Sequence, residues 1–106
     1  MAEMTRLQFD ILTALAPSRR HGYALIEEVE RMTRRRPGVA TMYAALNKLE
    51  SAGLVAPAGD EIVAGRVRRY FMLTPSGVDA LAEEASQMAT RSQIAMRSLG
   101  SRGATA

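Results

Sequence analysis

Apolar residues recur at helical spacing in three stretches of the first half of the chain. The first stretch predicts a helix over residues 4–15 that ends before a proline, and the second follows Tyr23 and ends in an arginine-rich turn. The third predicts a helix over residues 40–52 that stops at Gly53, a residue type common just after helix C-termini. The apolar positions are Leu7, Ile11, Leu12 and Leu15, then Leu25, Ile26, Val29 and Met32, then Met42, Leu46 and Leu49.

After the third helix the pattern changes to one typical of strands. Residues 54–57 predict a short strand and residues 67–73 a return strand, because β-branched, aromatic and apolar side chains are frequent there. Residues 58–65 are polar and contain two glycines, which predicts a turn region between the strands. Together these segments would form a β-hairpin wing.

The C-terminal quarter predicts one long helix. Thr74 supplies an N-cap hydroxyl and Pro75 a first-turn proline for a helix over residues 75–99. Residues 100–106 are small and polar, and we expect a disordered tail there. The predicted fold is therefore mainly α with a small β-hairpin: a winged helix-turn-helix DNA-binding domain over residues 1–74, followed by a C-terminal dimerisation helix.

Composition narrows the classes of protein that fit this fold. At 106 residues the chain is one domain with a modest core. Its net charge is +3, and Lys48 is the one lysine among 14 basic residues. Arginine suits contact with phosphate or guanine, although a GC-rich genome produces the same bias. No signal peptide and no apolar run of membrane-spanning length is evident, so we expect a soluble, cytoplasmic protein without membrane contact.

Catalytic patterns are missing from the sequence. The chain has no cysteine, which excludes disulfides, thiolate catalysis and zinc-thiolate sites. It also has no glycine-rich phosphate loop and no nucleophile elbow. His21 is the one histidine, and without nearby carboxylates at ligand spacing we interpret it as a packed or helix-capping imidazole. We therefore expect no enzymatic activity, no cofactor and no metal site.

The third helix is the candidate DNA-recognition helix. Met42, Leu46 and Leu49 define its core face, which leaves an outward surface that is small, polar and weakly basic. Alanine and threonine methyls can touch thymine methyls, and Asn47 can pair with adenine, whereas Lys48 is better placed for a phosphate. The alternative is an ordinary solvated surface helix. The predicted DNA-binding residues on this helix are Ala40, Thr41, Tyr43, Ala44, Asn47 and Lys48.

Three arginines near the wing tip complete the predicted DNA-binding set. Arg66, Arg68 and Arg69 would repel one another on a bare surface, so a phosphate partner is a sensible interpretation. The alternative is a set of solvated arginines that protect an edge strand from aggregation. The run at residues 34–36 either reaches phosphates from the turn before the third helix or is simply solvated.

The ordered set of these segments resembles the PadR family of bacterial transcriptional regulators, in its short branch, over roughly residues 7–81. The resemblance implies a homodimeric repressor that leaves its operator when an aromatic or lipophilic effector binds. The symmetry of a dimer would make that operator a pseudo-palindrome. It also implies that DNA contact is made by Thr41, Tyr43, Asn47, Lys48 and the wing arginines. The motifs that carry it are Ile11-Leu12, His21-Gly22-Tyr23-Ala24-Leu25, Thr41-Met42-Tyr43-Ala44-Ala45-Leu46, Leu49-Glu50-Ser51-Ala52-Gly53-Leu54-Val55, Gly65-Arg66, Arg69-Tyr70-Phe71, Leu73-Thr74 and Gly77.

The final helix supports a dimer independently of the resemblance. At about 1.5 Å per residue it would span roughly 36 Å, more than a core of this size can cover. Alternating steps of three and four residues define a predicted dimerisation seam, interrupted by Ser92 and made of Val78, Leu81, Ala85, Met88, Ala95 and Leu99. The alternative is a helix folded back along its own domain.

An effector site is a further hypothesis. Met4, Met88 and Met96 could line a cavity for a lipophilic molecule, because thioethers adapt to varied apolar ligands, although such residues more often only pack. The alternative to a DNA-binding regulator is a winged-helix protein-interaction module that binds no DNA and whose basic face meets an acidic protein.

Overall fold

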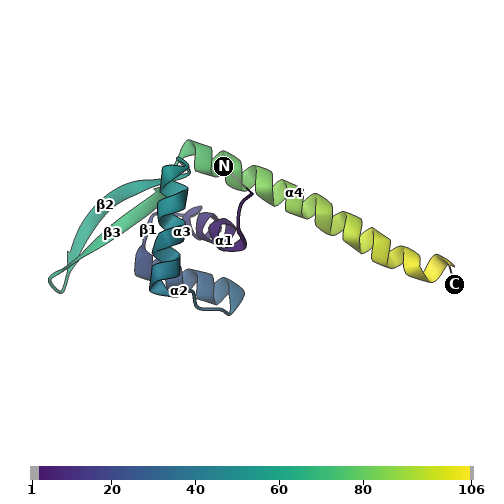
Figure 1. Cartoon of the computed structure of the whole chain (residues 1–106), viewed down its shortest axis with the longest axis horizontal. Coiled ribbons are helices and arrows are strands. Elements are labelled where there is room, and N and C mark those ends of the chain that lie inside the picture. Colours follow the sequence, from purple (N-terminus) through teal and green to yellow (C-terminus); the bar gives the residue numbers. More distant parts are fainter. Residues whose placement is uncertain (1–2, 106) are drawn as a thin grey trace.

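A computed structural model describes residues 3–105 as a small helical body with two projections (Figure 1). The hairpin of β2 and β3 projects on one side, and the last helix runs away from the body on the other. The predicted fold class, a winged helix-turn-helix with a long C-terminal helix, is confirmed. The elements are α1 (Arg6–Leu15), β1 (Arg20–His21), α2 (Gly22–Thr33), α3 (Val39–Ser51), β2 (Val55–Val63), β3 (Arg66–Leu73), α4 (Pro75–Gly100) and the short 3₁₀ helix η1 (Ser101–Thr105).

Side-chain caps fix where three of the helices begin. Thr5 and Gln8 form a capping box at α1, each accepting a hydrogen bond from the other's backbone N–H. The Nδ1 atom of His21 accepts from the backbone N–H of Ala24 at 3.1 Å, so the interpretation of His21 as a helix-capping imidazole is confirmed. Thr74 caps α4 just before its first-turn proline, as the sequence predicts.

The core lies where α1, α2 and α3 meet the inner part of the sheet. Met42, Leu46 and Leu49 of α3 are all buried, which confirms the predicted inward face. Phe71 anchors the return strand in the same cluster, and Leu73 packs half-buried against it. The remaining buried apolar residues are Ile11, Leu12, Ala14, Leu15, Leu25, Ile26, Val29, Leu54 and Val55.

The sheet is larger than the sequence predicts. Its strand order is β1-β3-β2 with antiparallel pairing throughout. The prediction of a turn region over residues 58–65 is wrong, because β2 continues to Val63 and the turn consists of Ala64 and Gly65. An irregularity between Pro57 and Asp60 shifts the register, after which the ladder resumes with mostly exposed residues, both charged and apolar. Neither face of this outer hairpin is buried, so apolar and polar residues do not alternate along it. The sequence of residues 58–65 therefore resembles that of a loop.

The start of α4 is held tightly against the end of α3. The backbone N–H of Thr74 donates to the Leu54 carbonyl at 3.1 Å, and its hydroxyl donates to the Gly53 carbonyl at 2.6 Å. Gly77 is buried one turn later, where an added Cβ would lie 2.0 Å from the Leu54 carbonyl oxygen. This contact sets the direction in which α4 leaves the body.

The outer part of α4 extends away from the helical body (Figure 1), and residues 85–100 are all exposed. The radius of gyration is 17.0 Å, compared with about 13 Å for a compact domain of this size. The helix runs to Gly100, one residue beyond the sequence prediction, and residues 101–105 form η1; the disorder expected for residues 100–106 stays a prediction. The last residue of that expected tail, Ala106, lies outside the described residues.

Candidate nucleic-acid interface

The exposed face of α3 contains all six residues of this helix that the sequence assigns to DNA contact. Each is exposed along a helix whose N-terminal end follows the α2–α3 turn. Val39, at the first position of the helix, is 64% exposed and extends the same surface, although sequence reasoning did not single it out. The face is free to lie against a flat or grooved partner.

Tyr43 has a second contact that the sequence did not indicate. Its ring lies over the first residue of α2, where a Cβ added to Gly22 would come within 2.2 Å of the tyrosine oxygen. The side chain remains 39% exposed. Tyr43 therefore both packs α3 against α2 and presents part of its surface to a partner.

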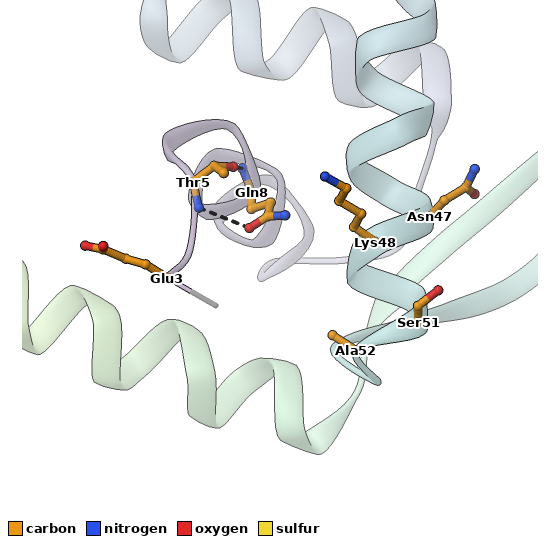
Figure 2. Close-up of a pocket in the computed structure, with 7 residues that line it drawn as sticks. All are labelled: Glu3, Thr5, Gln8, Asn47, Lys48, Ser51 and Ala52. Carbon is orange, nitrogen blue, oxygen red and sulfur yellow. Dashed lines mark hydrogen bonds between the residues drawn. The ribbon is translucent and has the colours of Figure 1, made fainter. Parts of the chain in front are cut away.

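Figure 2 shows how Asn47 and Lys48 diverge from neighbouring positions of α3. Lys48 extends on the side that faces α1, whereas Asn47 points to the opposite side of the helix. A groove of about 590 Å³ lies between α3 and the start of α1, where Thr5 and Gln8 form part of its wall. The ion pairs within residues 3–105 do not include Lys48, so its ammonium group can meet an external anion.

The turn between α2 and α3 holds one of its arginines in place. Arg36 donates to a Glu30 carboxylate oxygen at 2.9 Å and lies over the Tyr23 ring, with its guanidinium carbon 5.6 Å from the ring centroid. The hydrogen bond to Glu30 raises the pKa of Arg36. Arg34 ends α2 in a left-handed conformation with φ of 62° and is exposed, as is Arg35.

Two further carboxylates show how charge is arranged on the first two helices. Glu28 accepts a hydrogen bond from Arg31, which lowers the pKa of this partly buried glutamate. Burial raises the pKa of Asp10 in α1, while the charge of Arg6 acts in the opposite direction. Neither carboxylate lies on α3, where Lys48 and Glu50 are the two charged residues.

The register of the wing distinguishes its three arginines. Arg69 lies opposite Asp60 and Arg68 opposite Glu61, whereas Arg66 lies opposite the uncharged Val63. Opposite charges across a ladder stabilise a hairpin by about 0.2–1 kcal/mol. Two of the predicted phosphate contacts therefore have an acidic neighbour, and Arg66 at the tip does not.

The short strand β1 attaches the wing to the body. Its residues pair with Phe71 and Tyr70 of β3. The Arg19 guanidinium lies 4.2 Å from the Tyr70 ring centroid and donates to the Ala58 carbonyl at 2.9 Å, and His21 meets the same ring edge-on. Sequence reasoning missed this contact because a two-residue strand carries no periodicity.

The predicted dimerisation seam follows α4 along its exposed length. Val78, Met88 and Leu99 are exposed apolar residues, as the prediction requires. Leu81 differs, because it packs half-buried against the core of its own chain. Ile94 is 55% exposed but lies away from the seam, and the sequence prediction did not include it.

Two of the three methionines considered for an effector site lie together. Met4 and Met88 line a groove of about 510 Å³ between the start of α1 and the middle of α4, along with Phe9 and Arg91. Met96 does not line this groove and is exposed two turns further along α4. Among residues 3–105 no group of three His, Cys, Asp or Glu side chains could hold a metal ion. No helix of the described chain is long and apolar enough to cross a bilayer.

This architecture is a winged helix with a long C-terminal helix, and comparison with known proteins identifies the family. Residues 11–83 match the model of the transcriptional regulator PadR-like family, so the chain belongs to this family. Transcriptional regulator Rv3488 of Mycobacterium tuberculosis is 34% identical over 101 residues, covering 94% of this chain and 89% of the relative. Family and relative are transcriptional regulators, a class distinct from enzymes.

A second relative is an uncharacterized 37.1 kDa protein in transposon TN4556 of Streptomyces fradiae. It is 40% identical over 82 residues, which cover 77% of this chain. The aligned part spans only 23% of that longer protein.

Solved structures share the fold. A PadR family transcription regulator from Clostridium difficile R20291 has a TM-score of 0.77 at 24% identity, covering 90% of this chain and 99% of that one. Bacillus subtilis PadR, solved in complex with operator DNA, has a TM-score of 0.68 at 21% identity, covering 76% of this chain and 47% of that one.

Proposed function

We propose that this protein is a cytoplasmic, homodimeric repressor that binds a pseudo-palindromic DNA operator. The observation that carries the proposal is the exposed polar face of α3 beside a projecting basic wing (Figure 1). The operator complex of Bacillus subtilis PadR, which shares the fold, supports DNA as the partner.

In this proposal α3 lies in the major groove with its small residues against the groove floor. Ala40 and Ala44 permit close approach, and Asn47 is placed for bidentate contact with adenine. Lys48 and the exposed part of Tyr43 contact phosphates on either side. Phosphate contacts add affinity, and the α3 side chains supply sequence preference.

In this proposal the second subunit of the dimer binds through α4. Pairing of the exposed seam with its copy would bury Val78, Met88 and Leu99 and would place two α3 helices on one side of the dimer. Half-sites would then lie about 34–36 Å apart, or a multiple of that distance, along the duplex.

The groove lined by Met4 and Met88 is the proposed effector site. It lies between α1, which packs against α3, and α4, which carries the dimer seam, so a lipophilic ligand there contacts both parts. If the effector binds one shape of the dimer more tightly than the other by about 1–3 kcal/mol, its binding changes the affinity for the operator about 5- to 150-fold.

Selection from a pool of randomised duplexes tests DNA binding when the operator sequence has not been determined. We expect the full chain to enrich a pseudo-palindromic duplex and to bind it more weakly as salt rises, because phosphate contacts release counterions. Asn47→Ala should relax the preference at one base position per half-site, while Lys48→Ala should weaken binding to all duplexes. Failure to enrich any duplex would favour the protein-interaction alternative.

A further inference from the structure

The groove between α1 and α3 contains a buried amide with an unused donor. Gln8 of α1 is 6% exposed and lines this groove. Its Oε1 atom accepts from the backbone N–H of Thr5 at 3.0 Å, and this hydrogen bond fixes the orientation of the amide. The Nε2 atom therefore points the other way (Figure 2), and within residues 3–105 it donates no hydrogen bond. Because buried polar groups are normally hydrogen-bonded, this donor takes its partner from the groove.

A second donor faces the same space from α3. Lys48 extends toward α1, and Figure 2 shows the Gln8 amide nitrogen on the side of Gln8 that faces Lys48. The groove also lies at the N-terminal end of α1, where the helix dipole favours negative charge. Glu3, the acidic residue of the groove wall, directs its carboxylate away from Lys48 (Figure 2). An amide donor, an ammonium group and a positive helix end therefore meet in one groove.

The size and surface of the groove indicate a small organic anion. Its volume of about 590 Å³ lies within the range of small-molecule sites, and most of its wall surface is apolar although polar residues form it. A phosphate monoester combines an apolar body with three terminal oxygens that can accept from the amide and the ammonium, and phosphates bind readily at helix N-termini. Duplex DNA fits less well, because Gln8 is recessed and Asn47, on the proposed DNA-reading face, points to the opposite side of α3 (Figure 2).

We propose that the groove between α1 and α3 binds a phosphate monoester with a small apolar body, and that the bound ligand holds Lys48 away from DNA. The phosphate accepts from Gln8 Nε2 and Lys48 Nζ. This site differs from the groove lined by Met4 and Met88, which lies between α1 and α4. The second half of the proposal rests on the DNA-binding function proposed above, in which Lys48 contacts an operator phosphate. Ligand and operator then compete for one ammonium group.

Binding to the free protein is measured with phenyl phosphate as the probe. In an NMR titration at constant ionic strength, the side-chain NH₂ signal of Gln8 should shift saturably, with a Kd of about 1 mM or below. The side-chain signals of Gln87 and Gln93, which are exposed on α4, should stay in place. Inorganic phosphate should bind about 10-fold more weakly, because it lacks the apolar body. An unmoved Gln8 signal, or equal shifts of all three glutamines, would overturn the proposal.

Two variants test the two donors separately. Lys48→Gln removes the charge of an exposed residue and should weaken phenyl phosphate binding about 10-fold. Arg97→Gln is the matched control, because it removes an equal charge from an exposed position near the end of α4, and binding should be unchanged. Gln8→Glu can keep the capping box but replaces the donor by a negative oxygen, so it should weaken binding about 10-fold or more. Wild-type affinity of Lys48→Gln would overturn the proposal, even if Gln8→Glu fails to fold.

Competition with DNA is tested on the duplex that the full-length chain enriches. Saturating phenyl phosphate should lower the magnitude of the salt slope by about 1, and Lys48→Gln should show the lowered slope with and without the ligand. If bound duplex leaves the affinity for phenyl phosphate unchanged, the competition is wrong. A Gln8 signal that responds to the duplex but never to phenyl phosphate would assign the groove to a DNA backbone phosphate and overturn the proposal. If the wild-type chain enriches no duplex, the proposed function fails, while the titration of the free protein still decides the ligand site.

Discussion

At the scale of single residues, two glycines matter because another residue occupies the space that a side chain would need. Gly77 lies against the Leu54 carbonyl and Gly22 against the Tyr43 ring. The sequence shows that these positions are glycine, but not why, since each neighbour lies about twenty residues away along the chain. The capping role of His21 was predictable, because its partner is three residues away.

The Gly77→Ala substitution should destabilise the protein by roughly 3 kcal/mol or more, since the added methyl meets backbone that cannot rotate away. Urea unfolding at equilibrium measures the effect. Gly100→Ala is the matched control in the same helix, because nothing lies within 4 Å of its added Cβ, and it should be neutral or stabilising by up to about 1 kcal/mol. Equal stability of Gly77→Ala and wild type would contradict the packing described for the start of α4.

At the scale of elements, helices were easier to predict than strands. The apolar periodicity of α1, α2 and α3 reflects burial on one side, and the observed ends agree with the predicted ones within about two residues. The outer half of β2 pairs with β3 and is largely exposed on both faces, so its sequence contains no burial pattern. The face of α3 followed from its core residues, whereas the cross-strand neighbours of the wing arginines required the register.

The contact between Tyr43 and Gly22 should couple the positions of α2 and α3. Gly22→Ala should destabilise the protein in the wild-type background, because the tyrosine ring must move, and should have little effect in a Tyr43→Ala background. A double-mutant cycle in urea should give a coupling free energy of about 1 kcal/mol or more. Additive effects would mean that Tyr43 does not hold the two helices together. Gly38→Ala serves as the control for a glycine change near α3, because the added Cβ would make only an ordinary contact, 3.9 Å from Thr41 Oγ1.

At the scale of the whole molecule, the length of α4 was predictable and the packing of its residues only partly so. The dimerisation seam predicted from the sequence includes Leu81, which packs against the core of its own chain. It does not include Ile94, which is exposed on another side of α4. A heptad-like pattern cannot distinguish the core of one chain from the contact between two, because both bury the same kind of side chain.

The double variant Met88→Glu/Leu99→Glu should convert the proposed dimer to a monomer, since two carboxylates per chain would be buried in the seam. Light scattering after size exclusion measures the mass. Ile94→Glu is the control, because Ile94 points about 120° or more away from both seam positions on the helix, and its mass should remain that of a dimer. A dimeric double variant would show that the subunits associate elsewhere.

The rigid junction at Gly77 also determines how α4 can transmit motion. With 26 residues, the helix is a lever about 39 Å long whose fulcrum is a glycine pressed against a carbonyl oxygen. Because no space is free around Gly77, α4 does not bend at this point, and the helical body and α4 turn together as one rigid unit. A tilt of about 5° where two levers cross would carry their far ends roughly 3 Å, and each helical body would swing by the same angle. In the proposed dimer the adjustable joint would then be the crossing between the two α4 helices, and the fold of each subunit could stay unchanged while the distance between the two α3 helices varies.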